Sequence, residues 1–446
     1  MGFFKLLGNV RLSHHKKTAG MAAVTMPPPA EVLIPMAQHI GAPSIPVVKV
    51  GDEVKVGQKI GDAQGGVSTY IYASVSGKVT KIEDYVVSSG KSVPSIRIES
   101  DGLMTLDENI APPVIETFYD FVQAIKRSGL VGLGGAGFPT HIKLAPLEGG
   151  RIRYVIINAA ECEPYVTSDT RTMLDDAEFI EEGIALLRRF SPTSLKFIIG
   201  IEKNKLECIA ALGERFASAE DVEIKPLPER YPQGAEKVLI YNTIGRVVEE
   251  GKIPSDAGVL VLNVSTLAFI AKYVRTGMPL VSRTVTVDGG AIAEPKNVIV
   301  PVGTSIRDIV EFAGGFKKTP RKVLFGGPMM GIAAHSLDEP ILKATGVITC
   351  LSEDEINERE PTACIRCGRC IAACPLNLNA AAYSAALSIE NKEERIAALK
   401  ANKVNLCMEC GSCNYVCPAS RPLVQNSRLG KTELRTDAAH MKNLKK

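Results

Sequence analysis

The chain carries the stretch Cys364-Ile365-Arg366-Cys367-Gly368-Arg369-Cys370-Ile371-Ala372-Ala373-Cys374-Pro375, and Cys407-Met408-Glu409-Cys410-Gly411-Ser412-Cys413-Asn414-Tyr415-Val416-Cys417-Pro418 repeats its spacing. Each run follows the pattern Cys-x2-Cys-x2-Cys-x3-Cys-Pro, and together they hold eight of the eleven cysteines. This spacing is typical of thiolate ligands to a pair of [4Fe–4S] clusters. Because such clusters carry single electrons, the sequence predicts an electron-transfer protein.

The spacing also predicts which cysteines share a cluster. In sites of this bacterial ferredoxin type, the fourth cysteine of each run reaches the cluster of the other run. One cluster is therefore assigned to Cys364, Cys367, Cys370 and Cys417, and the second to Cys407, Cys410, Cys413 and Cys374. Zinc sites usually show isolated Cys-x2-Cys pairs, and disulfide scaffolds are small secreted chains, so neither alternative fits. The other cysteines, Cys162, Cys208 and Cys350, are expected to be buried free thiols, and His14, His15, His39 and His141 to lie at the surface.

Length and composition limit the remaining possibilities. A chain of 446 residues has room for three or four domains, and its net charge of +3 is too weak to indicate a nucleic-acid partner. No apolar run reaches the roughly 18 to 20 residues that span a bilayer. We therefore expect a cytoplasmic protein without a transmembrane segment, which reaches a membrane only through a partner.

Residues 1–110 are expected to form a β domain. Turn residues separate apolar stretches that predict strands at 46–50, 59–61, 69–73, 78–83 and 96–98. The run from Val50 to Gly61, followed by Ala73 to Val79, resembles the lipoyl/biotinyl barrel-sandwich fold, in which a hairpin lysine carries a swinging arm. No lysine occurs between Lys59 and Lys78. The resemblance therefore implies a barrel-sandwich domain without the arm, with a structural or docking role.

Residues 111–280 alternate helix and strand patterns, which predicts a doubly wound α/β domain with a parallel sheet. The glycine-rich loop 132–137 follows a predicted helix at 116–127 instead of a strand, so it is not a Rossmann dinucleotide loop. Its glycines still allow the backbone to approach a flat or phosphorylated ligand. Lys143, one turn into the next helix, can reach an anion. The predicted strands are 153–160, 195–200, 222–226 and 259–262, and the other predicted helices include 175–190 and 203–217.

The C-terminal third is expected to contain two further domains. Residues 281–350 combine predicted strands at 284–287, 297–301 and 322–325 with a helix at 306–313, as in a small β-grasp module. Residues 351–430 carry the twin cysteine runs, and the alanine-rich stretch 379–400 between them predicts a helical hairpin. Residues 431–446 are a basic C-terminal tail. The fold class is therefore multidomain α/β.

Four motifs in order resemble the NADH-oxidising flavoprotein subunit of respiratory complex I. They are the loop Gly132 to Lys143, Asn158-Ala159-Ala160-Glu161-Cys162-Glu163-Pro164, Tyr231-Pro232-Gln233-Gly234-Ala235-Glu236, and Asn263-Val264-Ser265-Thr266-Leu267-Ala268. With a barrel-sandwich domain before them, and an SLBB-type β-grasp module and twin-cluster domain after them, the whole chain resembles the RnfC family. Members of that family are the peripheral NAD(H)-reacting subunits of the Rnf ion-translocating ferredoxin:NAD oxidoreductase. The runs His14 to Ala19 and Gln38 to Pro43 also resemble that family.

The resemblance implies roles for individual residues. FMN would lie against Gly132, Gly134, Gly135, Lys143 and Asn158, with Asn263 and Thr266 at its phosphate end. Glu161, Glu163 and Glu236, the candidate catalytic residues, would border flavin and NADH together with Tyr231 and Gly234, and Phe138 would stack beside the nucleotide. A carboxylate of Glu236 near the adenosine ribose would repel a 2′-phosphate and favour NADH over NADPH.

The resemblance further implies FMN and two [4Fe–4S] clusters as cofactors and NAD(H) as substrate. Its implied partners are the membrane subunits and the iron–sulfur subunit that receives electrons from ferredoxin, and its implied place is the cytoplasmic face of the membrane. The sequence departs from complex I flavoproteins at Leu133, Ala160 and Ala235, which stand where those proteins have Arg, Asp and Glu. Two alternatives remain: a soluble NADH-dependent flavo-iron–sulfur reductase, of the cobalamin reductase or amino-acid reductase type, and a cluster-bearing adaptor without NADH activity.

Overall fold

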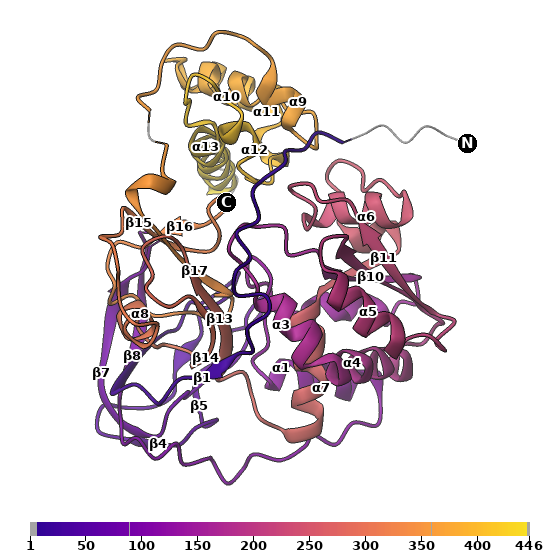
Figure 1. Ribbon diagram of the computed structural model, residues 1–446, viewed down its shortest axis with the longest axis vertical. Coiled ribbons are helices and arrows are strands. Elements are labelled where there is room, and N and C mark those ends of the chain that lie inside the picture. Colours follow the sequence, from indigo (N-terminus) through magenta and orange to yellow (C-terminus); the bar gives the residue numbers. More distant parts are fainter. Residues whose placement is uncertain (1–6, 89, 358, 444–446) are drawn as a thin grey trace.

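The computed structural model describes residues 7–88, 90–357 and 359–443. A helical part stands at one end of the longest axis, and a β-rich half and an α/β half lie next to each other below it (Figure 1). The N-terminal segment, drawn in indigo, runs down between these parts. The structural classes follow one another along the chain in the expected order.

Two small antiparallel sheets form the first domain. One has the order β2-β8-β7-β4 and the other β3-β5-β6, and Ile34, Ile60 and Ile96 are completely buried in their common core. The strands are β2 (Glu31–Pro35), β3 (Ile45–Pro46), β4 (Glu53–Val54), β5 (Lys59–Asp62), β6 (Ile71–Tyr72), β7 (Gly77–Val86) and β8 (Ser92–Ser100). The sequence did not predict β2. Its residues from Val32 to Pro35 are all buried, so it lacks the polar–apolar alternation of a half-exposed strand.

A parallel sheet with the order β11-β10-β9-β12 is the centre of the second domain. Its strands are β9 (Tyr154–Ala159), β10 (Lys196–Glu202), β11 (Val222–Leu227) and β12 (Val259–Asn263). Successive residues of β9 point to opposite faces: Val155 and Ile157 pack in the core that includes α1, α4, α5 and α7, whereas Ile156 packs against Leu239 and Ile240 of α6. Since helices cover both faces, the predicted doubly wound arrangement is confirmed.

The helices of this domain are α1 (Phe118–Arg127), α2 (Thr140–Leu144), α3 (Ser168–Asp175), α4 (Ala177–Phe190), α5 (Leu206–Arg215), α6 (Glu236–Ile244) and α7 (Val264–Thr276). Capping explains several of their ends. Thr117 and Asp120 form a capping box at the start of α1, and Asn263 caps α7, which ends at Gly277 in the left-handed conformation. Helix α3 was not predicted, because its sequence is polar and shows no apolar periodicity, although most of its residues are buried.

The third domain is built on a six-stranded sheet with the order β1-β14-β13-β17-β15-β16. Its elements are β13 (Ser282–Asp288), β14 (Lys296–Pro301), α8 (Ile306–Phe312), β15 (Lys322–Phe325), β16 (Ile332–Ala333) and β17 (Val347–Leu351). Val285, Val298 and Ile309 belong to its buried core. The edge strand β1 (Val24–Thr25) comes from the N-terminal segment and pairs in parallel with β14.

The cysteine runs lie in an all-helical domain. Its helices are α9 (Arg369–Ala373), α10 (Ala380–Leu387), α11 (Lys392–Ala401), α12 (Ser412–Tyr415) and α13 (Leu423–Asn443). The predicted hairpin between the runs is present as α10 and α11, and α13 packs on both. The expected tail is not a separate segment, because α13 continues past residue 431. Arg428 and Lys431 of this helix bind the carboxylate of Glu409 at 2.9 and 2.6 Å.

The N-terminal segment 7–25, which we call the strap, touches all of the later domains. Val10 and Tyr231 exchange two backbone hydrogen bonds of 2.9 Å. The hydroxyl groups of Thr18 and Thr167 lie 2.6 Å apart, and Asn297 donates to the carbonyl of Thr18 at 3.0 Å. Gly8 lies so close to the cluster domain that a Cβ there would be 2.3 Å from the carbonyl oxygen of Cys374. The strap therefore connects the domains noncovalently.

Candidate functional site

The glycine-rich loop lies at the carboxyl edge of the parallel sheet, against the start of α7. A Cβ at Gly134 would be only 2.3 Å from Nδ2 of Asn263, so only glycine allows this approach. The backbone N–H of Leu133 donates to Oγ1 of Thr266 at 2.9 Å, and the N–H of Thr266 donates to Oδ1 of Asn263 at 3.1 Å. The structure thus brings together the predicted residues of the loop and of α7, and gives Asn263 and Thr266 partners within the chain.

Lys143 and Glu236 form an ion pair of 2.7 Å across this edge. Lys143 comes from α2 and Glu236 from the first turn of α6, and their side chains are 34% and 38% exposed. Nearby, Nδ2 of Asn158 donates to the carbonyl of Gly234 at 2.8 Å. Four predicted site residues therefore meet in two pairs, and the Lys143–Glu236 pair remains accessible to a charged ligand.

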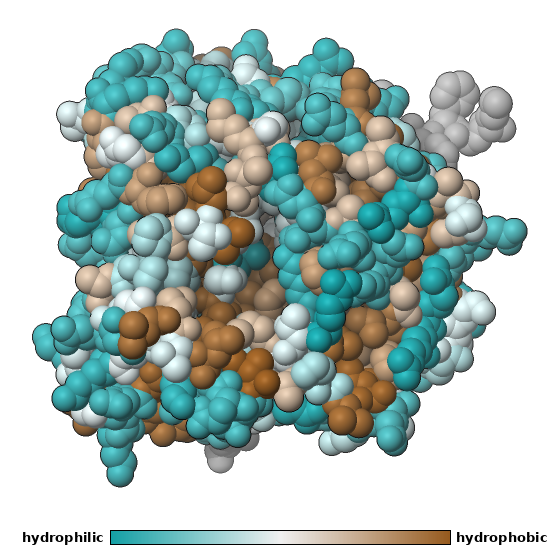
Figure 2. Space-filling view, turned by 60° about the horizontal axis from the view of Figure 1, so that its bottom comes forward, coloured by the Kyte–Doolittle hydropathy of each residue, from teal (hydrophilic) through white to brown (hydrophobic). Residues whose placement is uncertain are grey.

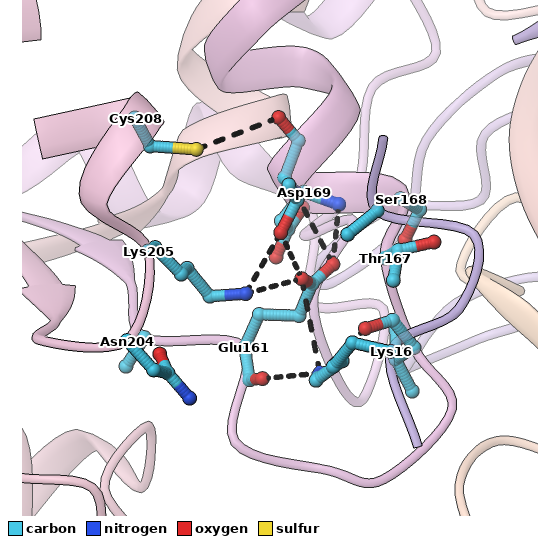
Figure 3. A network of polar contacts seen from close by, with 12 residues as sticks. Lys16, Glu161, Thr167, Ser168, Asp169, Asn204, Lys205 and Cys208 are labelled. Carbon is cyan, nitrogen blue, oxygen red and sulfur yellow. Dashed lines mark hydrogen bonds and ion pairs between the residues drawn. The ribbon is translucent and has the colours of Figure 1, made fainter. Parts of the chain in front are cut away.

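Glu161 lies in a buried polar network (Figure 3). One carboxylate oxygen accepts from Nζ of Lys205 at 2.9 Å and from Oγ1 of Thr170 at 2.6 Å, and the other accepts from the backbone N–H of Asp169 at 2.6 Å. Nζ of Lys16, from the strap, lies 3.9 Å from the same carboxylate. It donates to the backbone carbonyls of Glu161, Glu163 and Val166. Glu161 itself has a positive φ of 24°, which this network holds in place.

The charges of this network offset one another. Burial alone would raise the pKa of the Glu161 carboxyl, but Lys205 and Lys16 bring it below its ordinary value. Burial lowers the pKa of Lys16 to about 8 although Glu161 opposes the shift, whereas Glu161 keeps the pKa of Lys205 above its ordinary value against the effect of burial. The carboxylate of Glu161 has its partners within the chain, so it holds the loop after β9 in shape.

Two further buried charges support the glycine-rich edge, and sequence reasoning missed them. Asp169 accepts from Nδ2 of Asn263 at 2.7 Å and from Oγ of Ser265 at 2.6 Å, and burial raises its pKa to about 6. Arg283, from β13, donates to the carbonyl of Leu133 at 3.2 Å. Its Nε has no hydrogen-bond partner among the described residues. The only sequence feature that could have indicated Asp169 is the cluster of polar residues at 167–172. This cluster matches no known motif and shows no helical periodicity.

Glu163 and Tyr231 lie at the contact with the second cysteine run. The hydroxyl of Tyr231 lies 2.7 Å from the carbonyl oxygen of Cys410 and 3.2 Å from Oε1 of Glu163. The carboxylate of Glu163 also accepts from the backbone N–H groups of Met329 and Met330, at 3.1 and 3.0 Å. Burial raises the pKa of the Glu163 carboxyl despite these hydrogen bonds. The α/β domain, the third domain and the cluster domain therefore meet here.

Some cysteines of the two runs lie beside one another. Cys370 has Cys417 as a neighbour that raises its pKa, after the larger effect of burial. The pKa of Cys374 is likewise raised by burial and then by the nearby Cys410 and Cys407. Within the described ranges, no three metal-binding side chains converge tightly enough to hold one ion. A four-iron cube does not need that convergence, because each thiolate binds a separate iron.

The other predicted residues have varied surroundings. Cys208 and Cys350 are buried free thiols as expected, whereas Cys162 is only partly buried and its Sγ accepts from the N–H of Gly234 at 3.4 Å. The surface position expected for His141 is wrong. Its side chain is buried on α2, and burial lowers its pKa to about 4. Phe138 is half-buried, and its carbonyl accepts from the N–H of Gly132 at 2.8 Å, which closes the loop.

The edge of the sheet fits an FMN in its local chemistry. Beside Gly135 a Cβ would meet no atom within 4 Å, so the backbone is open to a flat ligand there. The N-terminus of α6, which has no side-chain cap, begins at this edge, and a helix N-terminus favours an anion. Lys143 supplies a positive charge nearby. A groove of about 400 Å³ elsewhere, lined by Ser384, Arg421, Asn426 and Glu433 among others, lies in the cluster domain and contains none of these groups.

On the face that lies at the bottom of Figure 1 and is turned forward in Figure 2, apolar side chains are interleaved with hydrophilic ones. Across residues 7–88, 90–357 and 359–443, no helix combines the length and the apolar character needed to cross a membrane.

Family models match consecutive parts of the chain. Residues 4–103 match the RnfC barrel sandwich hybrid domain and residues 125–272 the Nuo51 FMN-binding domain. Residues 284–333 match the SLBB domain, and residues 360–420 a 4Fe-4S dicluster domain. These matches confirm the predicted fold classes of the four domains and support FMN and two [4Fe–4S] clusters as cofactors.

Curated relatives match over most of the chain. The C subunit of the proton-translocating ferredoxin:NAD(+) oxidoreductase complex of Clostridium ljungdahlii is 43% identical over 378 residues, 83% of this chain and 82% of that protein. The C subunit of the Na(+)-translocating complex of Acetobacterium woodii is 43% identical over 80% of this chain and 82% of its own length. The C subunit of the ion-translocating oxidoreductase complex of Rhodobacter capsulatus is 38% identical over 84% and 73%. At this identity and coverage, the chain belongs to the RnfC family, the C subunits of ion-translocating oxidoreductase complexes.

Proposed function

We propose that this chain is the electron-transfer subunit of an Rnf-type ferredoxin:NAD+ oxidoreductase complex, which exchanges electrons between NAD(H) and partner subunits. The observation that carries the proposal is the direct contact between the α/β domain and the second cysteine run. Tyr231 belongs to the motif that borders the nucleotide edge, and its hydroxyl reaches the backbone of Cys410. A hydride acceptor on that edge and a one-electron carrier in that loop would therefore be neighbours.

The residues of the edge would divide the work of holding the nucleotides. Gly132, Gly134 and Gly135 would let the backbone approach a flat ring, and Asn158 holds the carbonyl of Gly234. Lys143 would hold an anionic group, and Glu236 sets the position of Lys143 in the absence of a ligand. FMN, when bound, supplies the step that iron–sulfur clusters cannot perform, because it takes up a hydride and gives up electrons singly. Glu161 and Glu163 would act by positioning, since their carboxylates are occupied within the chain.

The eight cysteines would ligate two [4Fe–4S] clusters in the crossed pattern. The neighbouring positions of Cys374, Cys407 and Cys410, and of Cys370 and Cys417, support it. The membrane subunits and the iron–sulfur subunit of the complex would be the partners. The chain would sit on the cytoplasmic face of the membrane, since its substrate NAD(H) is cytoplasmic and ion movement requires the spanning subunits.

An anaerobic NADH titration of the purified protein, reconstituted with FMN and clusters, tests this function. We expect NADH to bleach the flavin and then reduce the clusters, which visible absorption and EPR follow. The variant Lys143→Ala should lose the bleaching and weaken FMN retention, whereas the control Lys237→Ala, a partly exposed lysine on the same α6 as Glu236, should not. If FMN never binds and NADH leaves the spectrum unchanged, the protein is a cluster-bearing adaptor.

A further inference from the structure

The two cysteine runs differ at the position before their second cysteine. Arg366 and Glu409 occupy it, and each has a left-handed backbone, with φ of 55° and 59°. The carboxylate of Glu409 is bound by Arg428 and Lys431 of α13. Arg366 is exposed and makes no hydrogen bond or ion pair with any residue that the structure describes. At this position the second loop thus carries a negative charge with ion-pair partners, and the first loop carries a positive charge without one among the described residues.

The glycines that follow the second cysteine of each run show the same contrast. Gly368 and Gly411 both have positive φ, at 74° and 80°. A Cβ at Gly411 would be 2.6 Å from the carbonyl oxygen of Met329, whereas one at Gly368 would meet no atom within 4 Å. The second loop is therefore packed against the rest of the molecule. The first loop faces open space.

The first loop combines positive charge with an exposed apolar side chain. All residues from 361 to 369 are exposed, and they include Arg366 and Arg369 but no acidic residue. Arg369 likewise has no side-chain partner within the described part of the chain. Ile365, between Cys364 and Arg366, is 67% exposed. Met408, at the matching position of the second run, instead packs with Val10 and Tyr231. An apolar anchor inside a basic rim suits a transient contact with an acidic protein surface.

We propose that loop 361–369 is the docking surface for a redox protein whose one-electron centre lies under an acidic surface. The cluster of Cys407, Cys410, Cys413 and Cys374 then faces the nucleotide edge, and the cluster of Cys364, Cys367, Cys370 and Cys417 faces the partner. This inference rests on the proposed function. Two partner molecules would each give one electron to the outer cluster, and the two electrons with one proton would convert NAD+ to NADH.

The test uses two electron donors on the reconstituted full chain, with NADH formation as the readout. One donor is a reduced two-[4Fe–4S] bacterial ferredoxin, which is acidic, and the other is reduced methyl viologen, a small cation that needs no docking surface. For Arg366→Gln/Arg369→Gln we expect the ferredoxin-driven rate at low ionic strength to fall at least tenfold, since electrostatic steering accelerates association by about 10- to 1,000-fold. The salt dependence of that rate should flatten, and the viologen-driven rate should stay at the parental value.

Lys392→Gln is the matched control, because Lys392 is an exposed cation of the same domain outside the cysteine loops. Binding of oxidised ferredoxin, measured by titration calorimetry, gives a second readout that does not depend on electron flow. The proposal is overturned if the double variant keeps the parental ferredoxin rate and binding. It is also overturned if the viologen-driven rate falls equally, since the arginines then act on the cluster itself. If the parental protein reduces NAD+ with neither donor, the proposed function is refuted, and the docking proposal that rests on it is refuted with it.

Discussion

Glu161 and Glu236 stand in motifs that resemble the same flavoprotein, yet their surroundings are opposite. The side chain of Glu161 is 2% exposed and is held by Lys205, Thr170 and the strap. The side chain of Glu236 is 38% exposed and has Lys143 as its ion-pair partner. The buried carboxylate keeps the loop after β9 in one shape, and the open one is available to a ligand. Residues from motifs that resemble one protein can therefore have different roles: one stabilises the fold and another is available to bind a ligand.

The largest expected effect is the loss of the buried charge. Glu161→Ala leaves Lys205 and Lys16 buried without their counter-charge, which should lower the free energy of unfolding by about 3–5 kcal/mol. Glu236→Ala removes only a partly exposed pair and should cost about 0–1 kcal/mol. Urea denaturation of both variants measures the difference. If both variants lose a similarly small free energy of unfolding, the buried and the open carboxylate contribute equally to stability, which would contradict the difference described here.

The contact of the strap with the loop after β9 can be tested at Lys16. Lys16→Ala removes the ammonium that binds three backbone carbonyls, and leaving buried carbonyls unpaired should cost about 1–3 kcal/mol. The neighbouring Lys17 is exposed, so Lys17→Ala is the control. Limited proteolysis should cut the strap of the first variant faster than that of the second. Equal cleavage rates would show that Lys16 does not hold the strap.

The open carboxylate should influence which nucleotide is used. Glu236→Gln removes a negative charge that would repel a 2′-phosphate and frees Lys143 to attract it, so activity with NADPH relative to NADH should rise roughly tenfold, about 1.4 kcal/mol. Flavin bleaching by each nucleotide gives the ratio. Glu249→Gln, at an exposed position beyond the end of α6, should leave it unchanged. An unchanged ratio in the Glu236 variant would exclude this residue from nucleotide selection.

The smallest effect concerns pH. Burial raises the pKa of Glu202, next to the Glu161 network, to about 7, although Lys205 and Lys16 oppose the shift. The folded protein then keeps a proton that the unfolded chain releases above about pH 4.3. This contribution to stability is complete below that pH and is lost as the pH rises to about 7. Between pH 5.5 and 7.5, stability should therefore fall more in the parent than in Glu202→Gln; equal slopes in denaturation curves would contradict this.

Local patterns were sufficient for most elements of the fold. The burial of β9 on both faces, the capped start of α1 and the repeated cysteine spacing are all visible within short windows of sequence. Strand β2 and helix α3 were not predicted. Strand β2 has no polar face and helix α3 has no apolar stripe, so neither shows the periodicity on which the prediction depends. The interior position of His141 had no signal at all, because a single histidine on a short helix shows no pattern.

The site was only partly predictable. The approach of Gly134 to Asn263 and the pairing of Lys143 with Glu236 follow from motifs that end at one sheet edge. The buried network does not, because Glu161 finds Lys205 at 44 and Lys16 at 145 residues' separation, and no local rule connects them. The different packing of the two cysteine loops was equally hidden, since their spacing is identical and the contact of Gly411 with Met329 appears only in the fold.

The strap has a consequence for how the protein is made. Synthesis proceeds from the N-terminus at about 5–20 residues per second, so Gly8 waits roughly 20 to 70 s for Cys374, whose backbone it touches. For most of that time β1 also has no strand to pair with, because β14 begins only at Lys296. The segment that is translated first is therefore among the last to be placed. Its arrival joins domains that have already folded, and a bulky N-terminal fusion would hinder that final step.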